Sequence, residues 1–118
     1  MINHLLENPL FIIPFLGGVI FILAGFVQLK FPPKKINSLY GYRTKSSMKS
    51  NERWDFAQKL SAGEMMKSGG LLAVSSLLVF VTNFGDSINL IIGLALMLAT
   101  VPLLLLRVER KIKKKFRI

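Results

Sequence analysis

The sequence predicts an all-α integral membrane protein with three transmembrane helices and a cytoplasmic interfacial helix between the first and second. Of the 118 residues, 52% are hydrophobic, and they gather in three blocks instead of following the period of a soluble helix or strand. All 16 lysines and arginines lie in two segments, one that runs from the end of the first block to the start of the second and one that follows the third. The length allows a single membrane domain covering residues 1–118.

The first apolar block covers residues 10–29 and contains no charged residue. At 1.5 Å per residue, about 20 helical residues span the roughly 30 Å hydrocarbon core of a bilayer. Gln28, near the end of the block, is its one strongly polar side chain. Gly18 and Gly25 are seven residues apart and share a helix face, so we expect a neighbouring helix to approach closely there.

The second and third apolar blocks, residues 65–81 and 88–106, are predicted to form a helical hairpin. Gly69 and Ala73 lie four residues apart in the second block, which is a modest signal for close helix packing. The third block contains no charge, and the polar residues 82–87 are expected to form the turn between the two spans.

The distribution of cations predicts the orientation. Nine lie between residues 30 and 67 and seven between residues 107 and 117, whereas the N-terminal segment and the turn of the hairpin have none. Three crossings place both basic segments on one side of the membrane, and the positive-inside rule makes that side the cytoplasm. We therefore expect a cytoplasmic loop of residues 30–64, a basic cytoplasmic tail of residues 107–118 and an N-terminus outside.

The cytoplasmic loop is predicted to contain a short helix over residues 46–63. Ser50 or Asn51 is suited to cap its N-terminus, because short polar side chains accept a bond from the first free backbone N–H groups. Trp54 and Ala57 recur on one face. Such a helix either lies along the membrane surface or leads straight into the second span.

The tail of residues 107–118 has seven basic residues and one acid, Glu109. As a helix it places Val108, Ile112 and Phe116 near one face, so it either lies on the inner leaflet or acts only as a topology anchor, which we favour. Anionic lipid head groups are the expected partners of both basic segments. Nucleic acid is not expected, because the run has no aromatic platform or fold motif beside it.

The loop sequence INSLYGYRTKSSMKSNERWDFAQ resembles the signature of the SdpI family of bacterial membrane proteins. The matching positions are Pro33, Ile36, Asn37, Gly41, Tyr42, Arg43, Thr44, Ser47, Met48, Trp54 and Ala57. In the family a hydrophobic span lies on each side of this motif, as here, and the resemblance covers about residues 19–81. Several family members carry Asn where this chain has Gln58.

The resemblance implies a non-enzymatic, multi-pass protein of the bacterial cytoplasmic membrane. The family's namesake protects a toxin-producing cell from a secreted antimicrobial peptide and signals by holding a repressor at the membrane. It has more spans than this chain, and the repressor-binding role depends on whether the missing parts carry it. We expect protection against, or sensing of, a membrane-active peptide, with a peptide toxin and a transcriptional repressor as partners. The expected binding residues are Asn37, Tyr40, Gly41, Tyr42, Arg43, Thr44, Ser47, Trp54 and Ala57.

The chemistry of the loop leaves alternatives open. Arg43 is suited to bind a lipid phosphate or one of the carboxylates of Glu52, Asp55 and Glu64. An equal alternative is that the loop is a structural cap over the bundle, since tyrosine and tryptophan suit the membrane interface. Two further hypotheses are an assembly subunit that oligomerises through its glycine faces and a phospholipid-binding protein that uses residues 40–44.

The sequence offers no catalytic or cofactor site. It contains no cysteine, and His4, its single histidine, lies in the predicted outer segment. No His, Asp and Glu residues follow the spacing of a metal site, and there is no glycine-rich phosphate loop. We therefore expect neither an enzyme nor a cofactor.

Overall fold

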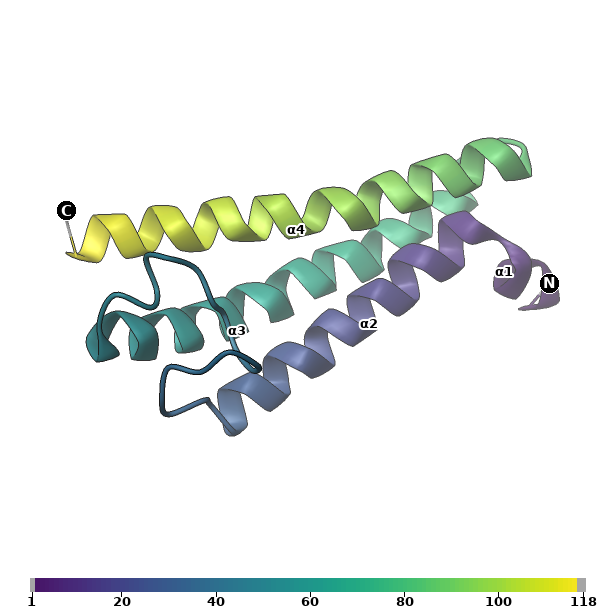
Figure 1. Ribbon diagram of the computed structural model, residues 1–118. Coiled ribbons are helices and arrows are strands. Elements are labelled where there is room, and N and C mark those ends of the chain that lie inside the picture. Colours follow the sequence, from purple (N-terminus) through teal and green to yellow (C-terminus); the bar gives the residue numbers. More distant parts are fainter. Residues whose placement is uncertain (1, 117–118) are drawn as a thin grey trace.

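The computed structural model describes residues 2–116, which form an antiparallel bundle of three long helices (Figure 1). A short helix, α1 (Ile2–Glu7), precedes α2 (Pro9–Lys30). α3 (Asn51–Ser75) continues into the 3-10 helix η1 (Ser76–Phe80), and α4 (Asp86–Phe116) follows. No strand occurs in residues 2–116, and the start of α1 and the end of α4 lie at opposite ends of the bundle.

Polar caps define where the first two long helices begin. Asn8 has an extended backbone, and its side-chain oxygen accepts a bond of 2.9 Å from the Leu10 N–H. Pro9 occupies the first position of α2, where a missing N–H is least disruptive. Ser50 caps α3, because its Oγ accepts a bond of 3.2 Å from the Arg53 N–H. The predicted cap at Ser50 is thus confirmed.

α3 is one continuous helix, so the structure has no separate interfacial helix between α2 and α3. The helix predicted over residues 46–63 begins at Asn51 and runs without a break into the second apolar block, as far as Ser75. The helix therefore leads straight into the second apolar block and does not form a separate element along the membrane surface. The reason is local: no proline interrupts Asn51–Ser75, and only at Ser76 does the backbone tighten into η1.

α4 also extends further than the third apolar block. Its 31 residues give a length of about 46 Å, well beyond the roughly 30 Å hydrocarbon core. The tail is therefore a continuation of α4 and not a separate element on the leaflet. Val108 and Ile112 are fully buried with Ala57 of α3, and Phe116 packs against this cluster. The apolar face of the tail is therefore part of the core, and its role as a topology anchor stays a prediction.

Small residues bring α2 and α3 into close contact. A Cβ atom on Gly18 would lie 2.6 Å from the Ala73 backbone nitrogen, and one on Gly25 would lie 2.6 Å from the Ala62 oxygen. A Cβ on Gly69 would lie 2.6 Å from the Gly18 oxygen. Real Cβ contacts are longer than this, so the interface requires glycine at these three positions. The predicted close approach is confirmed, and both glycine patterns meet in the same interface.

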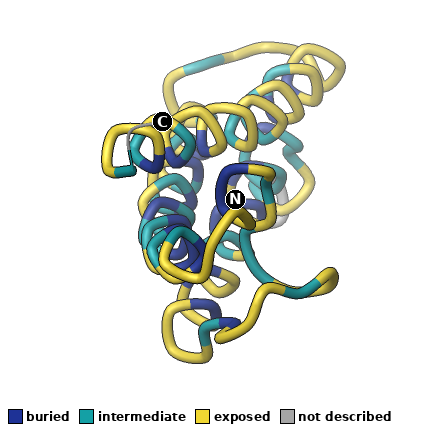
Figure 2. The backbone as a smooth tube through the Cα atoms, turned by 60° about the vertical axis from the view of Figure 1, so that its left-hand side comes forward, coloured by how far each residue is buried: buried dark blue, intermediate teal, exposed yellow. Residues whose placement is uncertain are grey.

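Two helices, α2 and α4, are long and apolar enough to cross a membrane. Only 28% of the apolar stretch of α2 and 17% of that of α4 is buried within the chain, whereas the core helix of a soluble protein is mostly buried. Many large apolar side chains are exposed, among them Leu71, Ile91 and Leu98, each at least 65% exposed. Exposed positions, coloured yellow, recur along the helices in Figure 2. Exposed apolar side chains on helices of this length indicate a membrane protein.

Candidate functional site

The segment between α2 and α3 carries most of the family-like motif, and it folds against the end of the bundle where the chain terminates (Figure 1). It lies over the beginning of α3 and the last turns of α4. Hydrogen bonds to Trp54 and Gln58 of α3 and to Glu109 of α4 hold it there.

Gln58 of α3 holds the middle of the segment through its side-chain amide. Its Oε1 accepts a bond of 2.7 Å from the Tyr42 N–H, and its Nε2 donates a bond of 2.7 Å to the Tyr42 carbonyl. From α2, the Gln28 amide donates to the main-chain oxygen of Gln58 at 2.9 Å and to Ser61 Oγ at 2.7 Å. Gln28, Gln58 and Ser61 are all at least 94% buried, so these bonds join two helices and the loop inside the protein.

Glu109 of α4 accepts hydrogen bonds from three hydroxyl groups of the same segment. Its carboxylate accepts bonds from Tyr42 Oη at 2.8 Å, Thr44 Oγ1 at 3.1 Å and Ser46 Oγ at 2.6 Å. Burial raises the pKa of the Tyr42 hydroxyl far above its usual value, and the bond to Glu109 raises it further. Tyr42 therefore remains a proton donor to the carboxylate at any physiological pH.

A tight turn follows Tyr42 and fixes the hydroxyl donors. Thr44 and Ser47 bond reciprocally: the Thr44 N–H donates to Ser47 Oγ at 2.8 Å, and the Ser47 N–H donates to Thr44 Oγ1 at 3.2 Å. Ser47 is fully buried. The two residues thus act as a local support that aims Thr44 at Glu109.

Gly41 allows the segment to approach Gln58. Its φ of +104° lies in a region that side chains rarely adopt, and a Cβ there would lie 2.6 Å from Pro33 Cγ. Trp54 is fully buried and donates a bond of 2.7 Å from Nε1 to the Pro33 carbonyl. Ala57 is also fully buried and belongs to the core with α4. These three motif residues have structural roles in placing the segment.

Asn37, Tyr40 and Arg43 lie nearer the surface. Asn37 Oδ1 accepts bonds from the backbone N–H groups of Leu39 and Tyr40, and Tyr40 Oη donates a bond of 2.7 Å to the Phe31 carbonyl. Arg43 is exposed, and in the part of the chain from residue 5 to 116 it makes no hydrogen bond or ion pair. The structure therefore does not bring Arg43 to a carboxylate of its own chain.

The carboxylate of Glu64 instead faces α4. It is 2% exposed and pairs with Lys111 Nζ at 2.8 Å and Arg107 Nε at 3.0 Å. The bond from Lys111 and, less strongly, the bond from Arg107 hold the pKa of Glu64 below its usual value, although burial opposes both. Among the described residues, no group of three or more His, Asp or Glu could hold a metal ion, and the side chain of His4 lies outside that part.

Sequence reasoning missed Gln58 and Glu109, the two residues that organise the segment. Weak signals existed for both. Glu109 is the single acid in a tail of seven basic residues, and Gln28, which supports Gln58, is the one strongly polar side chain of the first apolar block. A lone polar residue in either setting needs a partner, because burying it without one is unfavourable.

Known proteins resemble this chain over most of its length. Residues 34–106 match the SdpI/YfhL protein family, a range that contains most of the segment and the bonds between Gln58 and Tyr42 but not Gln28 or Glu109. The chain is 37% identical over 97 residues to the uncharacterized protein YfhL of Bacillus subtilis (strain 168), which covers 82% of this chain and 83% of the relative. No match was found among solved structures. The chain belongs to the SdpI/YfhL family, as its loop motif indicated.

Proposed function

We propose that this protein crosses the bacterial cytoplasmic membrane three times and protects it against, or senses, a membrane-active peptide without catalysing a reaction. Family membership supports the general role. The exposure of Arg43 supports the site: the motif residues around it, Tyr42, Thr44 and Ser47, are bonded inside the protein, whereas Arg43 points to no partner within residues 5–116.

The second crossing is the least apolar of the three, and its length supports it. Residues 65–75 of α3, which are mainly apolar but include Lys67, give about 16 Å, and the five residues of η1 add about 10 Å. Together they approach the roughly 30 Å of the hydrocarbon core. In this topology the cytoplasmic part consists of the loop, the first half of α3 and the end of α4. The N-terminal and C-terminal ends of the bundle lie on opposite sides of the membrane.

The backbone next to Arg43 is fixed by hydrogen bonds. The Gln58 amide bonds to the main-chain N–H and carbonyl of Tyr42, so the position of the following residue, Arg43, is preorganised for binding. A guanidinium at the membrane edge binds carboxylates bidentately. We propose that Arg43 binds an acidic group of the peptide or of a protein that reports its presence.

The hypothesis of an assembly subunit loses its main support. Gly18, Gly25 and Gly69 are covered by the α2–α3 contact within one chain and cannot also form a contact between chains. Oligomerisation would need other faces.

The test is survival of a sensitive bacterium that expresses the protein and is exposed to the cognate membrane-active peptide. We expect wild type to increase survival and Arg43→Ala to lose most of that increase at equal membrane abundance. Lys45→Ala is the matched control, because it removes an exposed cation two residues away. Equal survival of cells with wild type and with empty vector, when the protein is correctly inserted, would reject the function; protection unaffected by Arg43→Ala would reject the site.

A further inference from the structure

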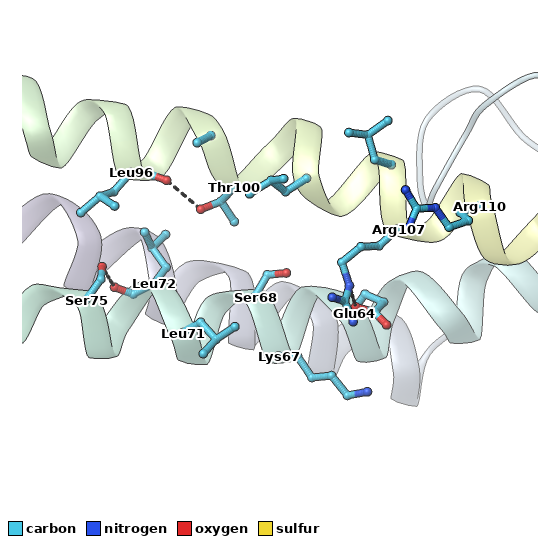
Figure 3. Close-up of a pocket in the computed structure, with 13 residues that line it drawn as sticks. Glu64, Lys67, Ser68, Leu71, Leu72, Ser75, Leu96, Thr100, Arg107 and Arg110 are labelled. Atoms are coloured by element: carbon cyan, nitrogen blue, oxygen red, sulfur yellow. Dashed lines mark hydrogen bonds and ion pairs between the residues drawn. The ribbon is translucent and has the colours of Figure 1, made fainter.

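A groove of about 570 Å³ runs between α3 and α4, and no residue of the loop that carries Arg43 lines it (Figure 3). Its volume falls within the roughly 300–1,000 Å³ that is usual for small-molecule sites. The groove begins at the Glu64–Arg107 ion pair and runs towards Ser75 and Leu96, along the apolar part of both helices.

The wall of the groove is apolar despite its hydroxyl groups. Leu71, Leu72 and Leu103 supply much of the lining. The Ser75 hydroxyl donates to the Leu72 carbonyl at 2.5 Å, and the Thr100 hydroxyl donates to the Leu96 carbonyl at 2.8 Å. Because these two hydroxyls are satisfied by their own helices, they do not require a polar ligand. Ser68, the third hydroxyl residue of the lining, lies next to Lys67 towards the basic end. The wall therefore suits a hydrocarbon chain.

The end of the groove nearest the tail is strongly basic. Lys67, Arg107 and Arg110 line it, and Glu64 is the one carboxylate among the lining residues. Glu64 is already neutralised by Arg107 and by Lys111 from outside the groove. Arg107 uses only Nε in this pair within the described chain, so its terminal nitrogens remain available to an anion.

We propose that this groove binds an anionic phospholipid, with one acyl chain along the leucine wall and the phosphate between Arg107, Arg110 and Lys67. The order of the basic end and the apolar wall along the groove agrees with the layers of a bilayer. The three cations lie at the cytoplasmic boundary of the proposed second and third spans, at head-group level, and the apolar wall lies within the hydrocarbon core. The inference uses the proposed topology but not the role against a peptide.

The experiment is native mass spectrometry of the full chain purified in mild detergent and mixed with phosphatidylglycerol or phosphatidylcholine. We expect wild type to retain the anionic lipid preferentially. Arg110→Ala should weaken that retention about fivefold, corresponding to about 1 kcal/mol per cation near a head group. Lys114→Ala is the matched control, because it removes an exposed cation one turn further along α4 that does not line the groove.

A second pair of variants tests the wall. Ala99→Phe places a ring in the groove and should abolish retention, whereas Ala95→Phe makes the same change on an exposed position that does not line it. Equal retention of both lipids by wild type would overturn the proposal. So would retention that follows lipid charge but is unchanged by Ala99→Phe, because the lipid would then lie on the basic surface, and so would retention of an added acidic amphipathic peptide in place of lipid.

Discussion

Removing the Gln58 side chain should release the loop segment from the helices. Gln58 is 1% exposed and makes two bonds of 2.7 Å to the Tyr42 peptide. In Gln58→Ala the Tyr42 N–H loses its acceptor, at a cost of about 1–3 kcal/mol, and the loss of the second bond adds about 1 kcal/mol. Gln28 keeps its bonds to the main chain of residue 58 and to Ser61, so the helices should stay together.

Limited trypsin digestion after Lys45 measures this release. A cost of about 2–4 kcal/mol raises the population of the open segment about 30- to 700-fold, since about 1.4 kcal/mol corresponds to a factor of ten. When opening and closing are faster than cleavage, the cleavage rate follows that population. Asp55→Ala is the control, because Asp55 is exposed on the same helix and makes no bond within the described residues. Equal cleavage rates for wild type, Gln58→Ala and Asp55→Ala would refute the role of Gln58.

Three further predictions concern packing, charge and the loop. Gly18→Ala should destabilise the bundle by about 1–3 kcal/mol in a detergent-unfolding titration, because its Cβ meets the backbone of Ala73; Gly70→Ala, in open space, should stabilise it slightly. The folded state lowers the pKa of Glu64, so its contribution to stability is complete above the ordinary value of 4.5 and is lost as pH falls through the lower folded value. Glu64→Gln should remove that acid dependence, and an unchanged pH profile would contradict it. Trp54, the single tryptophan, should show blue-shifted emission and slow quenching by a water-soluble quencher, because it is fully buried; emission typical of exposed indole would contradict the position of the loop.

The sequence predicted those features that depend on local pattern. Gly18 and Gly25 indicated a closely packed face because their spacing alone puts them on one side of a helix, and Ser50 indicated a helix start because capping involves only the next few residues. The all-helical fold and the family follow from the same kind of local reasoning.

The features that depend on distant contacts were not predictable in this way. Glu109 meets Tyr42 across 67 positions of the sequence, and no spacing rule links them. The tail looked like a solvated basic run, yet Val108 and Ile112 bury one face of it against Ala57. Gln58 differs from the Asn of several family members, and its amide bonds to both the main-chain N–H and the carbonyl of Tyr42.

The central claim is that both basic segments lie in the cytoplasm because the chain crosses the membrane three times. The chain has no cysteine, so single cysteines can be introduced at Asn83, in the turn before α4, and at Lys113, near the end of α4. In intact cells a membrane-impermeant thiol reagent should label Asn83→Cys, whereas Lys113→Cys should react only after lysis. Labelling of both positions from the same side of the membrane would contradict the account.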